Sequence, residues 1–248
     1  MITRDQLQTH LHEFLQCGRF RDYAPNGLQV EGRAEIRRIL TAVTASQAAI
    51  AAAIDWQADA LLVHHGYFWK GEAPQVVGMK KRRLAALLAH DVNLFAYHLP
   101  LDQHPELGNN ALFARHFACE AVWQSAEEPL IWHARLAPTS LPDLLAQLEG
   151  GLEREPVAVG AVNEPLTRIA WCSGAAQDFL QQAAGEGAQA FISGEYAERS
   201  YHEARETGTV YISCGHHASE RAGIRALGEY LATAFDLQQR FFDEENPF

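Results

Sequence analysis

The chain has 248 residues, of which 48% are hydrophobic and 21% charged, as is ordinary for a soluble globular protein of one large or two small domains. Its net charge of −11 argues against a general nucleic-acid binder, because phosphate neutralisation requires a basic surface. No apolar run approaches the ~18 residues of a membrane span, and no signal peptide is visible. The four cysteines are scattered without C-x-x-C spacing, which favours reduced thiols and a cytoplasmic location.

Apolar periodicity predicts that helices and strands alternate through the first half of the chain. Thr3 and Ser46 stand before two of the helical patterns as N-cap residues. The segment 22–27 is dense in turn-forming residues and is expected to be an ordered loop. In chain order we expect a helix over 3–17, an edge strand over 28–32, a strand over 36–43, a helix over 46–56, a strand over 60–65, a basic helix over 80–89, a strand over 92–98 and a helix over 109–117.

The middle of the chain is interrupted by prolines, and only a helix over 141–148 is predicted there. We interpret 126–165 as a connecting subregion between a first α/β half at 1–125 and a second at 166–248. Strands alternating with helices indicate an α/β fold. In the second half we expect strands over 169–172, 190–193 and 210–214, and helices over 177–184, 201–206 and 219–232.

The sequence also contains an internal repeat. Segments that begin at Arg38 and Arg168 align without gaps over about thirty residues, so that 58–60 matches 188–190. His64-His65 then falls opposite Gly194-Glu195. We interpret the repeat as a duplication, which predicts two similar α/β halves.

The predicted strand over 60–65 ends in two adjacent histidines, His64 and His65. Imidazole suits zinc, iron, nickel and copper, and the ends of buried strands commonly carry the sites of α/β folds. Successive side chains of a strand point to opposite faces, so the pair is not expected to bind one ion as a single fork. The two rings would flank one position or serve two neighbouring ions. The alternative is that both histidines merely end a strand near solvent.

Each half also places a carboxylate four residues after a histidine. A helix is expected to bring His216 and Glu220 to one face, whereas Pro100 favours a turn between His98 and Asp102. Two halves folding together would bring these strand ends to one cleft, with more ligands than one tetrahedral zinc requires. Hydrolytic sites commonly use two metal ions about 3.5–4 Å apart. The candidate ligands are His64, His65, Asp102, His216 and Glu220.

Four motifs of the chain are similar to those of a known family. They are the segment 22–32, Val63-His64-His65-Gly66, the segment 98–102 and the segment 215–220. Over nearly its whole length the chain resembles the GTP cyclohydrolase I type 2 homologues, also called NGG-interacting-factor-three-like proteins. Long stretches resemble the enterobacterial branch of that family.

The resemblance implies two intertwined α/β halves with α/β/α layers, a dinuclear metal centre and a ring-shaped homohexamer. It places Glu220 as the natural bridging ligand and His98 near the metals. It gives His217 a structural or supporting role and leaves the roles of Glu195 and His202 open. The implied metal ligands are again His64, His65, Asp102, His216 and Glu220.

The leading hypothesis is a dinuclear metal-dependent hydrolase that acts on a small molecule such as the nucleotide GTP. His98 is the candidate general acid or base. Zinc, manganese, iron and nickel all suit the two divalent sites. The competing hypothesis is a ring-shaped, metal-binding scaffold or adaptor without turnover. A ring that encircles nucleic acid is the weakest option because of the negative net charge.

Overall fold

The computed structural model describes residues 1–162 and 164–248, which form two compact units. Unit 1 comprises Met1–Leu107 and Gly223–Glu245, and unit 2 comprises Gly108–Ala222 and Asn246–Phe248. The stretch 126–165, interpreted from sequence as a connecting subregion, supplies strands and a helix to unit 2, and its residue 163 lies outside the described part. Across the described residues, no helix is long and apolar enough to cross a membrane.

Unit 1 is built on a five-stranded sheet with the order β13-β4-β5-β6-β2. All neighbours are parallel except β2, which runs antiparallel to β6 at the edge of the sheet, as its sequence predicted. A short antiparallel pair, β1 with β3, stands apart from it. The bounds are β1 (Ile2–Thr3), β2 (Gly27–Val30), β3 (Glu35–Ile36), β4 (Arg38–Thr44), β5 (Ala60–His65), β6 (Asn93–Ala96) and β13 (Gln238–Phe241).

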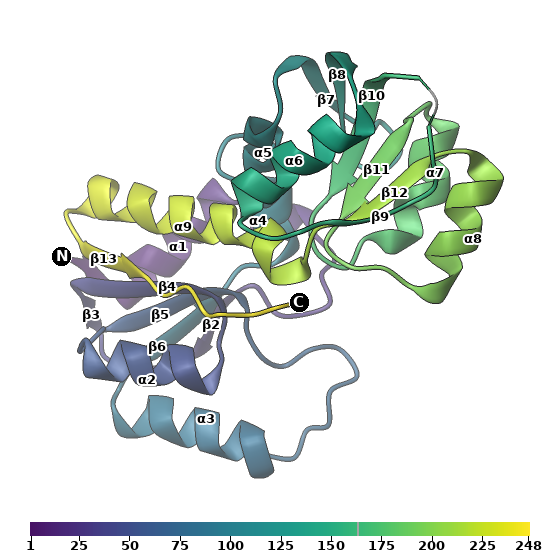
Figure 1. Ribbon diagram of the computed structural model, residues 1–248. Helices are drawn as coiled ribbons and strands as arrows, with labels where there is room; N and C mark the ends of the chain where they lie inside the picture. Colours follow the sequence, from purple (N-terminus) through teal and green to yellow (C-terminus); the bar gives the residue numbers. More distant parts are fainter. Residues whose placement is uncertain (163) are drawn as a thin grey trace. The chain divides into compact units, whose positions relative to one another are not determined.

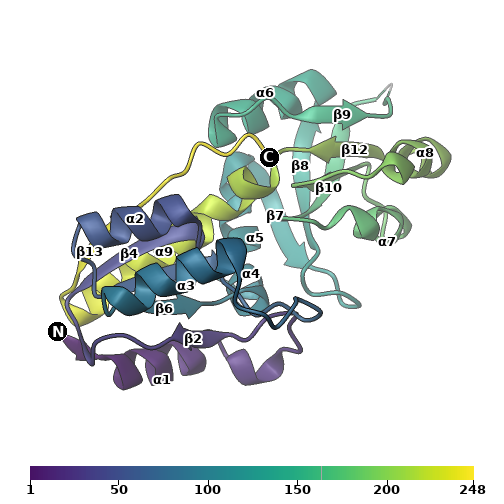
Figure 2. The same ribbon diagram turned by 90° about the horizontal axis from the view of Figure 1, so that it is seen from below.

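Helices cover both faces of this sheet, so unit 1 has the expected three layers (Figure 1). One face carries α1 (Arg4–Phe14) and the part of α9 (His216–Phe235) that belongs to unit 1. The other face carries α2 (Gln47–Asp55) and α3 (Gly78–Ala89), which lie side by side in Figure 2. Short helices η1 (Cys17–Arg19) and α4 (Leu99–Gln103) complete the unit.

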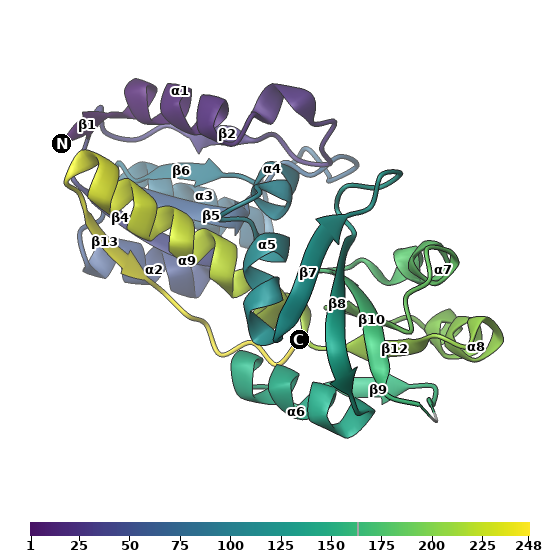
Figure 3. The ribbon, with the colours of Figure 1, turned by 90° about the horizontal axis from the view of Figure 1, so that it is seen from above.

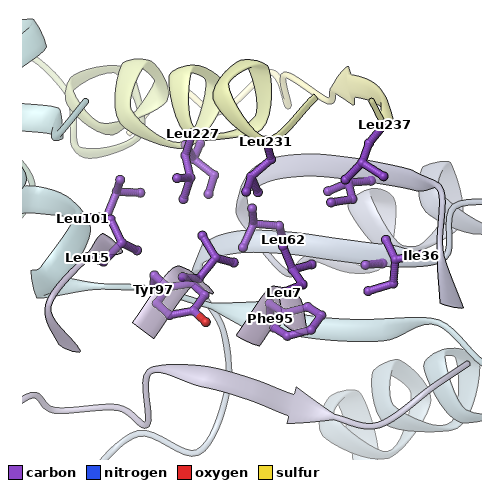
Figure 4. Packing of buried hydrophobic residues seen from close by; sticks show 14 of the residues in the cluster. Leu7, Leu15, Ile36, Leu62, Phe95, Tyr97, Leu101, Leu227, Leu231 and Leu237 are labelled. Atoms are coloured by element: carbon purple, nitrogen blue, oxygen red, sulfur yellow. The ribbon is translucent and has the colours of Figure 1, made fainter. Parts of the chain in front are cut away.

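The core between α1, α9 and the sheet holds unit 1 together. Leu7, Leu62, Phe95 and Leu227 are fully or almost fully buried in one cluster, which Figure 4 shows from close by. Each such side chain contributes roughly 1.5–3 kcal/mol through its removal from water. The helix starts follow the sequence: Thr3 forms a capping box with α1, and the Ser46 side chain accepts the Ala49 N–H at 3.0 Å.

Unit 2 contains a six-stranded sheet with the order β7-β8-β10-β11-β12-β9. Strands β10, β11 and β12 are parallel, and β7, β8 and β9 are paired antiparallel to their neighbours. The bounds are β7 (Cys119–Gln124), β8 (Trp132–Thr139), β9 (Val157–Val159), β10 (Leu166–Cys172), β11 (Ala190–Ser193) and β12 (Val210–Ser213).

The unit 2 sheet is also covered on both faces (Figure 3). Leu144 and Leu148 of α6 pack with Trp171 on one face, and Leu180 of α7 packs with Phe191 on the other. The helices are α5 (Asn109–Phe113), η2 (Ala114–His116), α6 (Leu141–Leu152), η3 (Gln177–Phe179), α7 (Leu180–Gly185) and α8 (Glu198–Thr207).

The two units share a strand register that supports the predicted duplication. Ile39 pairs with Ala60 in unit 1, and Ile169 pairs with Ala190 in unit 2, which are the positions matched by the sequence repeat. Both pairings are parallel and are linked by helical segments. The duplication itself stays a prediction.

His133 in β8 is a buried titratable group that contributes to the stability of unit 2. Its Nε2 lies 2.7 Å from Glu186 Oε2, and its ring stacks on Trp123 with centroids 5.6 Å apart. Burial lowers the pKa of His133 in spite of the opposing effect of Glu186. Burial also acts to raise the pKa of Glu186, but hydrogen bonds from Gln182, Ser125 and His133 lower it overall.

These shifts predict that acid destabilises unit 2. A histidine whose pKa is lowered by folding binds its proton in the unfolded chain first, so stability is lost as the pH falls below about 6.5. The lowered pKa of Glu186 adds a loss at still lower pH. We expect the free energy of unfolding, measured by urea titration from pH 7 to 5, to fall less steeply in His133→Gln, by at most about 1.4 kcal/mol per pH unit. Equal slopes in the variant and wild type would contradict this account.

Candidate metal centre

Three histidines of unit 1 lie together where β5 and β6 end. His64 and His65 close β5, and His98 directly precedes α4. One ring nitrogen of each lies within 4.8 Å of the others. The ring centroids of His64 and His65 are 4.6 Å apart, and those of His64 and His98 are 5.1 Å apart. The cluster therefore offers several nitrogen donors to one small volume.

The expectation that the rings of His64 and His65 flank one position or serve two neighbouring ions agrees with this clustering. The last paired residues of β5 and β6 are Val63 and Ala96, whereas His65 still pairs with Thr44 of β4. The two histidines lie beyond the pairing with β6, so their rings have room to reach the same point from the end of the strand.

A hydrogen bond to the backbone fixes the tautomer of His64. His64 is fully buried, and its Nδ1 lies 3.0 Å from the carbonyl oxygen of Tyr97. Because a carbonyl only accepts, Nδ1 carries the proton and Nε2 keeps the lone pair. His65 Nδ1 lies 3.3 Å from the Thr44 hydroxyl. Metal-binding histidines are commonly held through their other nitrogen in this manner.

His98 is held more firmly, by a buried carboxylate. Its Nδ1 lies 2.7 Å from Asp22 Oδ1, and Asp22 also accepts from Tyr23 N, Asn26 Nδ2 and Leu99 N. Burial acts to raise the pKa of Asp22, but the bonds and charge of His98, with Asn26 and Tyr23, lower it to about 2. The predicted loop over 22–27 therefore orients the ring of His98, and the Nε2 of that ring points away from Asp22. Sequence reasoning gave Asp22 no role, although the residue lies in a motif of the family resemblance.

Asp102 reaches the same cluster from α4. Its Oδ1 lies 3.5 Å from His64 Nε2, and the residue is 5% exposed. The turn expected between His98 and Asp102 is wrong, because Leu99–Gln103 is helical and Asp102 N bonds His98 O. Pro100 lies in the first turn of the helix, where its missing N–H has no intrahelical partner to lose.

A second cluster lies within unit 2, at the start of α9. His216 is the first residue of that helix, and its Nε2 lies 3.1 Å from Glu220 Oε2, one turn later. Its Nδ1 lies 2.7 Å from Glu195 Oε1. Burial acts to lower the pKa of His216, but hydrogen bonds and charge from Glu220 and Glu195 raise it to about 9. In the absence of another cation, the protonated ring balances part of this negative charge.

The Glu220 carboxylate packs closely against the backbone at a position that only a glycine leaves open to it. Gly174 has a φ of +68°, and a Cβ added to it would stand 2.2 Å from Glu220 Oε1. Glu220 is 3% exposed, and burying a carboxylate is costly unless a cation or hydrogen bonds compensate. The glycine therefore protects the position of a buried anionic oxygen that is suited to a metal ligand.

The sequence also singled out Glu195, His202 and His217. Glu195 belongs to the unit 2 cluster through His216. His202 is exposed on α8 and pairs with Glu198 at 3.1 Å, outside that cluster. His217 is buried, and its backbone N–H donates to Phe248 O at 3.0 Å.

The donor chemistry of both clusters fits divalent metal ions. Unit 1 offers imidazole nitrogens with the Asp102 carboxylate, and unit 2 offers His216 with the Glu220 carboxylate. Mixed nitrogen and oxygen donors suit zinc, manganese, iron and nickel. The cysteines of the chain are free thiols, and none belongs to either cluster as described. Structural zinc sites favour thiolates, which this donor set does not include.

Known proteins resemble this chain over its full length. It is 50% identical over 248 residues to the "GTP cyclohydrolase 1 type 2 homolog" of Neisseria meningitidis serogroup A, with 100% of both chains covered. The Escherichia coli K12 protein of the same description is 47% identical over 244 residues, covering 98% of each chain. A solved structure described as "protein ybgI, unknown function" matches with a TM-score of 0.96 and 46% identity, covering 100% of both chains. The sequence profile of the Duf34/NIF3 (NGG1p interacting factor 3) family matches residues 2–247, and the chain belongs to that family.

Proposed function

We propose that the protein is a dinuclear metal-dependent hydrolase that acts on a nucleotide such as GTP. The observation that carries the proposal is the tethering of one nitrogen on histidines of both clusters. His64 is tied to the Tyr97 carbonyl and His216 to the Glu195 carboxylate. This is how proteins orient imidazoles toward a metal ion. The ligands in this proposal are His64, His65, Asp102, His216 and Glu220.

Bound divalent ions would supply Lewis acidity and lower the pKa of a water molecule toward neutrality. Glu220 would help to hold the ions, because its buried carboxylate offers two oxygens and Gly174 lets Oε1 pack closely against the backbone. His98 would take up or give a proton at Nε2. Asp22, ionised and bonded to Nδ1, fixes the tautomer of His98 and stabilises the ring when it is protonated.

The printed names of the relatives supply the substrate class. In a cyclohydrolase reaction of this type, one water adds at C8 of the purine and opens the imidazole ring to a formamide, and a second water hydrolyses the formamide so that C8 leaves as formate and the amine is freed. The free thiols suit a cytoplasmic location, where nucleotides are abundant. The proposal includes assembly into a homohexameric ring, as the sequence resemblance implies.

Metal content tests the ligand assignment. We expect about two divalent ions per chain in wild-type protein purified without chelator and analysed by plasma mass spectrometry. His65→Ala and Glu220→Gln should each hold clearly less metal. His202→Ala is the matched control, because His202 is an exposed histidine outside both clusters, and it should keep the wild-type content. Wild type that takes up no zinc or manganese would refute the proposal.

The close approach of Glu220 to Gly174 gives a second prediction. Gly174 and Gly208 both have positive φ, +68° and +72°, so alanine should strain both sites to a similar degree, about 1–2 kcal/mol. Only the Gly174 Cβ would displace the Glu220 carboxylate, since nothing lies within 4 Å of the Gly208 position. We expect Gly174→Ala to lose metal affinity in titrations with zinc while Gly208→Ala retains it. Equal affinities in the two variants would show that Glu220 is not a ligand.

The role of His98 is tested by turnover. Formate release from GTP should fall about 10²–10⁴-fold in His98→Asn, the usual loss when a proton-transfer residue is removed. Asp22→Asn should reduce kcat in the same direction, since it removes the charge that orients the ring. Both variants should keep the wild-type metal content. Metal loss in His98→Asn would make His98 a ligand instead, and fully metallated wild type without turnover on GTP or other nucleotides would favour a scaffold.

A further inference from the structure

Unit 1 contains a cavity of about 550 Å³ at the end of its sheet opposite to the histidines. The wall forms where strands begin: Arg38 opens β4, Asp59 precedes β5 and Val92 precedes β6. Because strand β5 rises about 3.3 Å per residue, the cavity and His65 are roughly 20 Å apart. The cavity is therefore separate from the histidine cluster.

The cavity is lined by three arginines and a single buried carboxylate. Asp59 is 9% exposed, and its Oδ1 lies 3.0 Å from Arg33 Nη1. Its Oδ2 accepts the backbone N–H groups of Arg37 at 2.7 Å and Arg38 at 2.9 Å. The Asp59 carboxylate therefore joins the segments that form the wall. Of the three arginine side chains of the wall, it pairs with that of Arg33.

The charges of the other two arginines are poorly compensated within the described part of the chain. The Arg37 side chain is 69% exposed; its ion pair with Glu35 is long, at 3.8 Å, and its Nε donates to Met1 Sδ at 3.3 Å. Arg38 donates to neutral oxygens only: Gln238 Oε1 at 3.0 Å and the Trp56 carbonyl at 3.3 Å, with Gln57 Oε1 at 3.4 Å. The wall therefore carries an excess of positive charge next to a space of ligand size.

A strained residue contributes a side chain to this wall. Gln57 follows the last turn of α2 with a φ of 56°, a conformation in which glycine is the usual residue. The Gln57 side chain lines the cavity and reaches Arg38. Glu153 and Asp236 have the same left-handed backbone after other helices, so the evidence for a ligand is the place of the Gln57 side chain on the cavity wall.

Unit 2 serves as an internal control, because it repeats the structural contacts of this region. Arg168, which matches Arg38 in the sequence repeat, donates to the Glu186 carbonyl at 2.9 Å at the end of α7. Gln189, which matches Asp59, accepts the backbone N–H groups of Thr167 and Arg168 at 2.7 and 3.0 Å. One arginine and one side-chain acceptor are therefore sufficient to join these elements.

The side chains of Arg37 and Gln57 belong to the wall in unit 1, and other residues stand at the matching positions of unit 2. Thr167 stands at the position of Arg37, and Gly187, with a φ of +87°, stands at that of Gln57. The fold thus requires neither the second guanidinium nor the strained amide. Their presence in unit 1 points to a ligand.

We propose that this cavity binds a small phosphate monoester. A phosphate dianion offers oxygens to more than one guanidinium, whereas a single fork satisfies a carboxylate. The phosphate would lie against Arg37 and Arg38, with the Gln57 amide as a further donor. The organic part would lie against Ile54, Ala58 and Val92, which give the wall its apolar portion. The volume lies within the usual range of small-molecule sites, about 300–1,000 Å³.

Isothermal titration of the full chain with adenosine 5′-monophosphate tests the proposal, with adenosine and succinate as comparison ligands. We expect saturable binding of the monophosphate, and at least tenfold weaker binding of adenosine and of succinate. Arg37→Gln should weaken the monophosphate at least tenfold. Arg135→Gln is the matched control, because Arg135 is 61% exposed and faces Glu120 at 3.4 Å, and it should bind as wild type does.

Two further variants separate this site from alternatives. His65→Ala should bind the monophosphate with unchanged affinity, because the histidine cluster is not involved. Gln57→Gly should weaken binding and at the same time raise Tm by about 2–4 °C, since it relieves the strained backbone. The proposal is overturned if wild type does not bind the monophosphate, if Arg37→Gln leaves the affinity unchanged, if His65→Ala abolishes binding, or if succinate binds as tightly.

Discussion

The hydrogen bond between His98 Nδ1 and Asp22 Oδ1, 2.7 Å long, exemplifies the constraint on which the site depends. An imidazole has two nitrogens, and the partner of one decides what the other can do. His64 meets this constraint with a backbone carbonyl, and His216 meets it with Glu195. In each case an oxygen acceptor occupies Nδ1, so Nε2 is the nitrogen left for a cation or a proton, and on His216 it holds a proton that pairs with Glu220. The three partners come from segments far from their histidines in sequence.

The fold supplies these partners because its strands end together. In unit 1, β5 delivers His64 and His65, and β6 delivers Tyr97 and His98 next to it. In unit 2, β11 is followed by Glu195 and β12 by His216, and the two strands are parallel neighbours. The buried cores on both faces of each sheet keep these ends in register. The same arrangement places the beginnings of the strands at the opposite edge, where unit 1 has its arginine-lined cavity.

Local pattern predicted much of the buried part of this structure, although not strand β8. The apolar run before His64 and the caps at Thr3 and Ser46 depend on neighbouring residues, and the structure confirms them. Strands β7, β9 and β13 were missed because they are partly exposed and carry few buried apolar side chains. Strand β8 was missed although Trp132, Ala134 and Leu136 are buried, because polar and charged residues interrupt its apolar run. The start of α9 was predicted three residues late, at Ser219, so His216 was placed before the helix rather than in its first turn.

The candidate ligands could be named from sequence because histidine and carboxylate spacing is local. Their orientation could not be predicted, since it rests on Asp22, Tyr97 and Glu195, which contact the histidines across the fold. The cavity could not be predicted from the sequence either, because Arg33 and Arg38 meet Asp59 only after β4 and β5 have paired.

Anomalous X-ray diffraction on crystals of the metal-loaded protein, recorded on both sides of the metal absorption edge, tests the central claim most directly. The account predicts two anomalous peaks per chain about 3.5–4 Å apart, with His64 and His65 Nε2 and the Glu220 carboxylate among the coordinating atoms. A single peak, or peaks that none of these atoms coordinates, would contradict it.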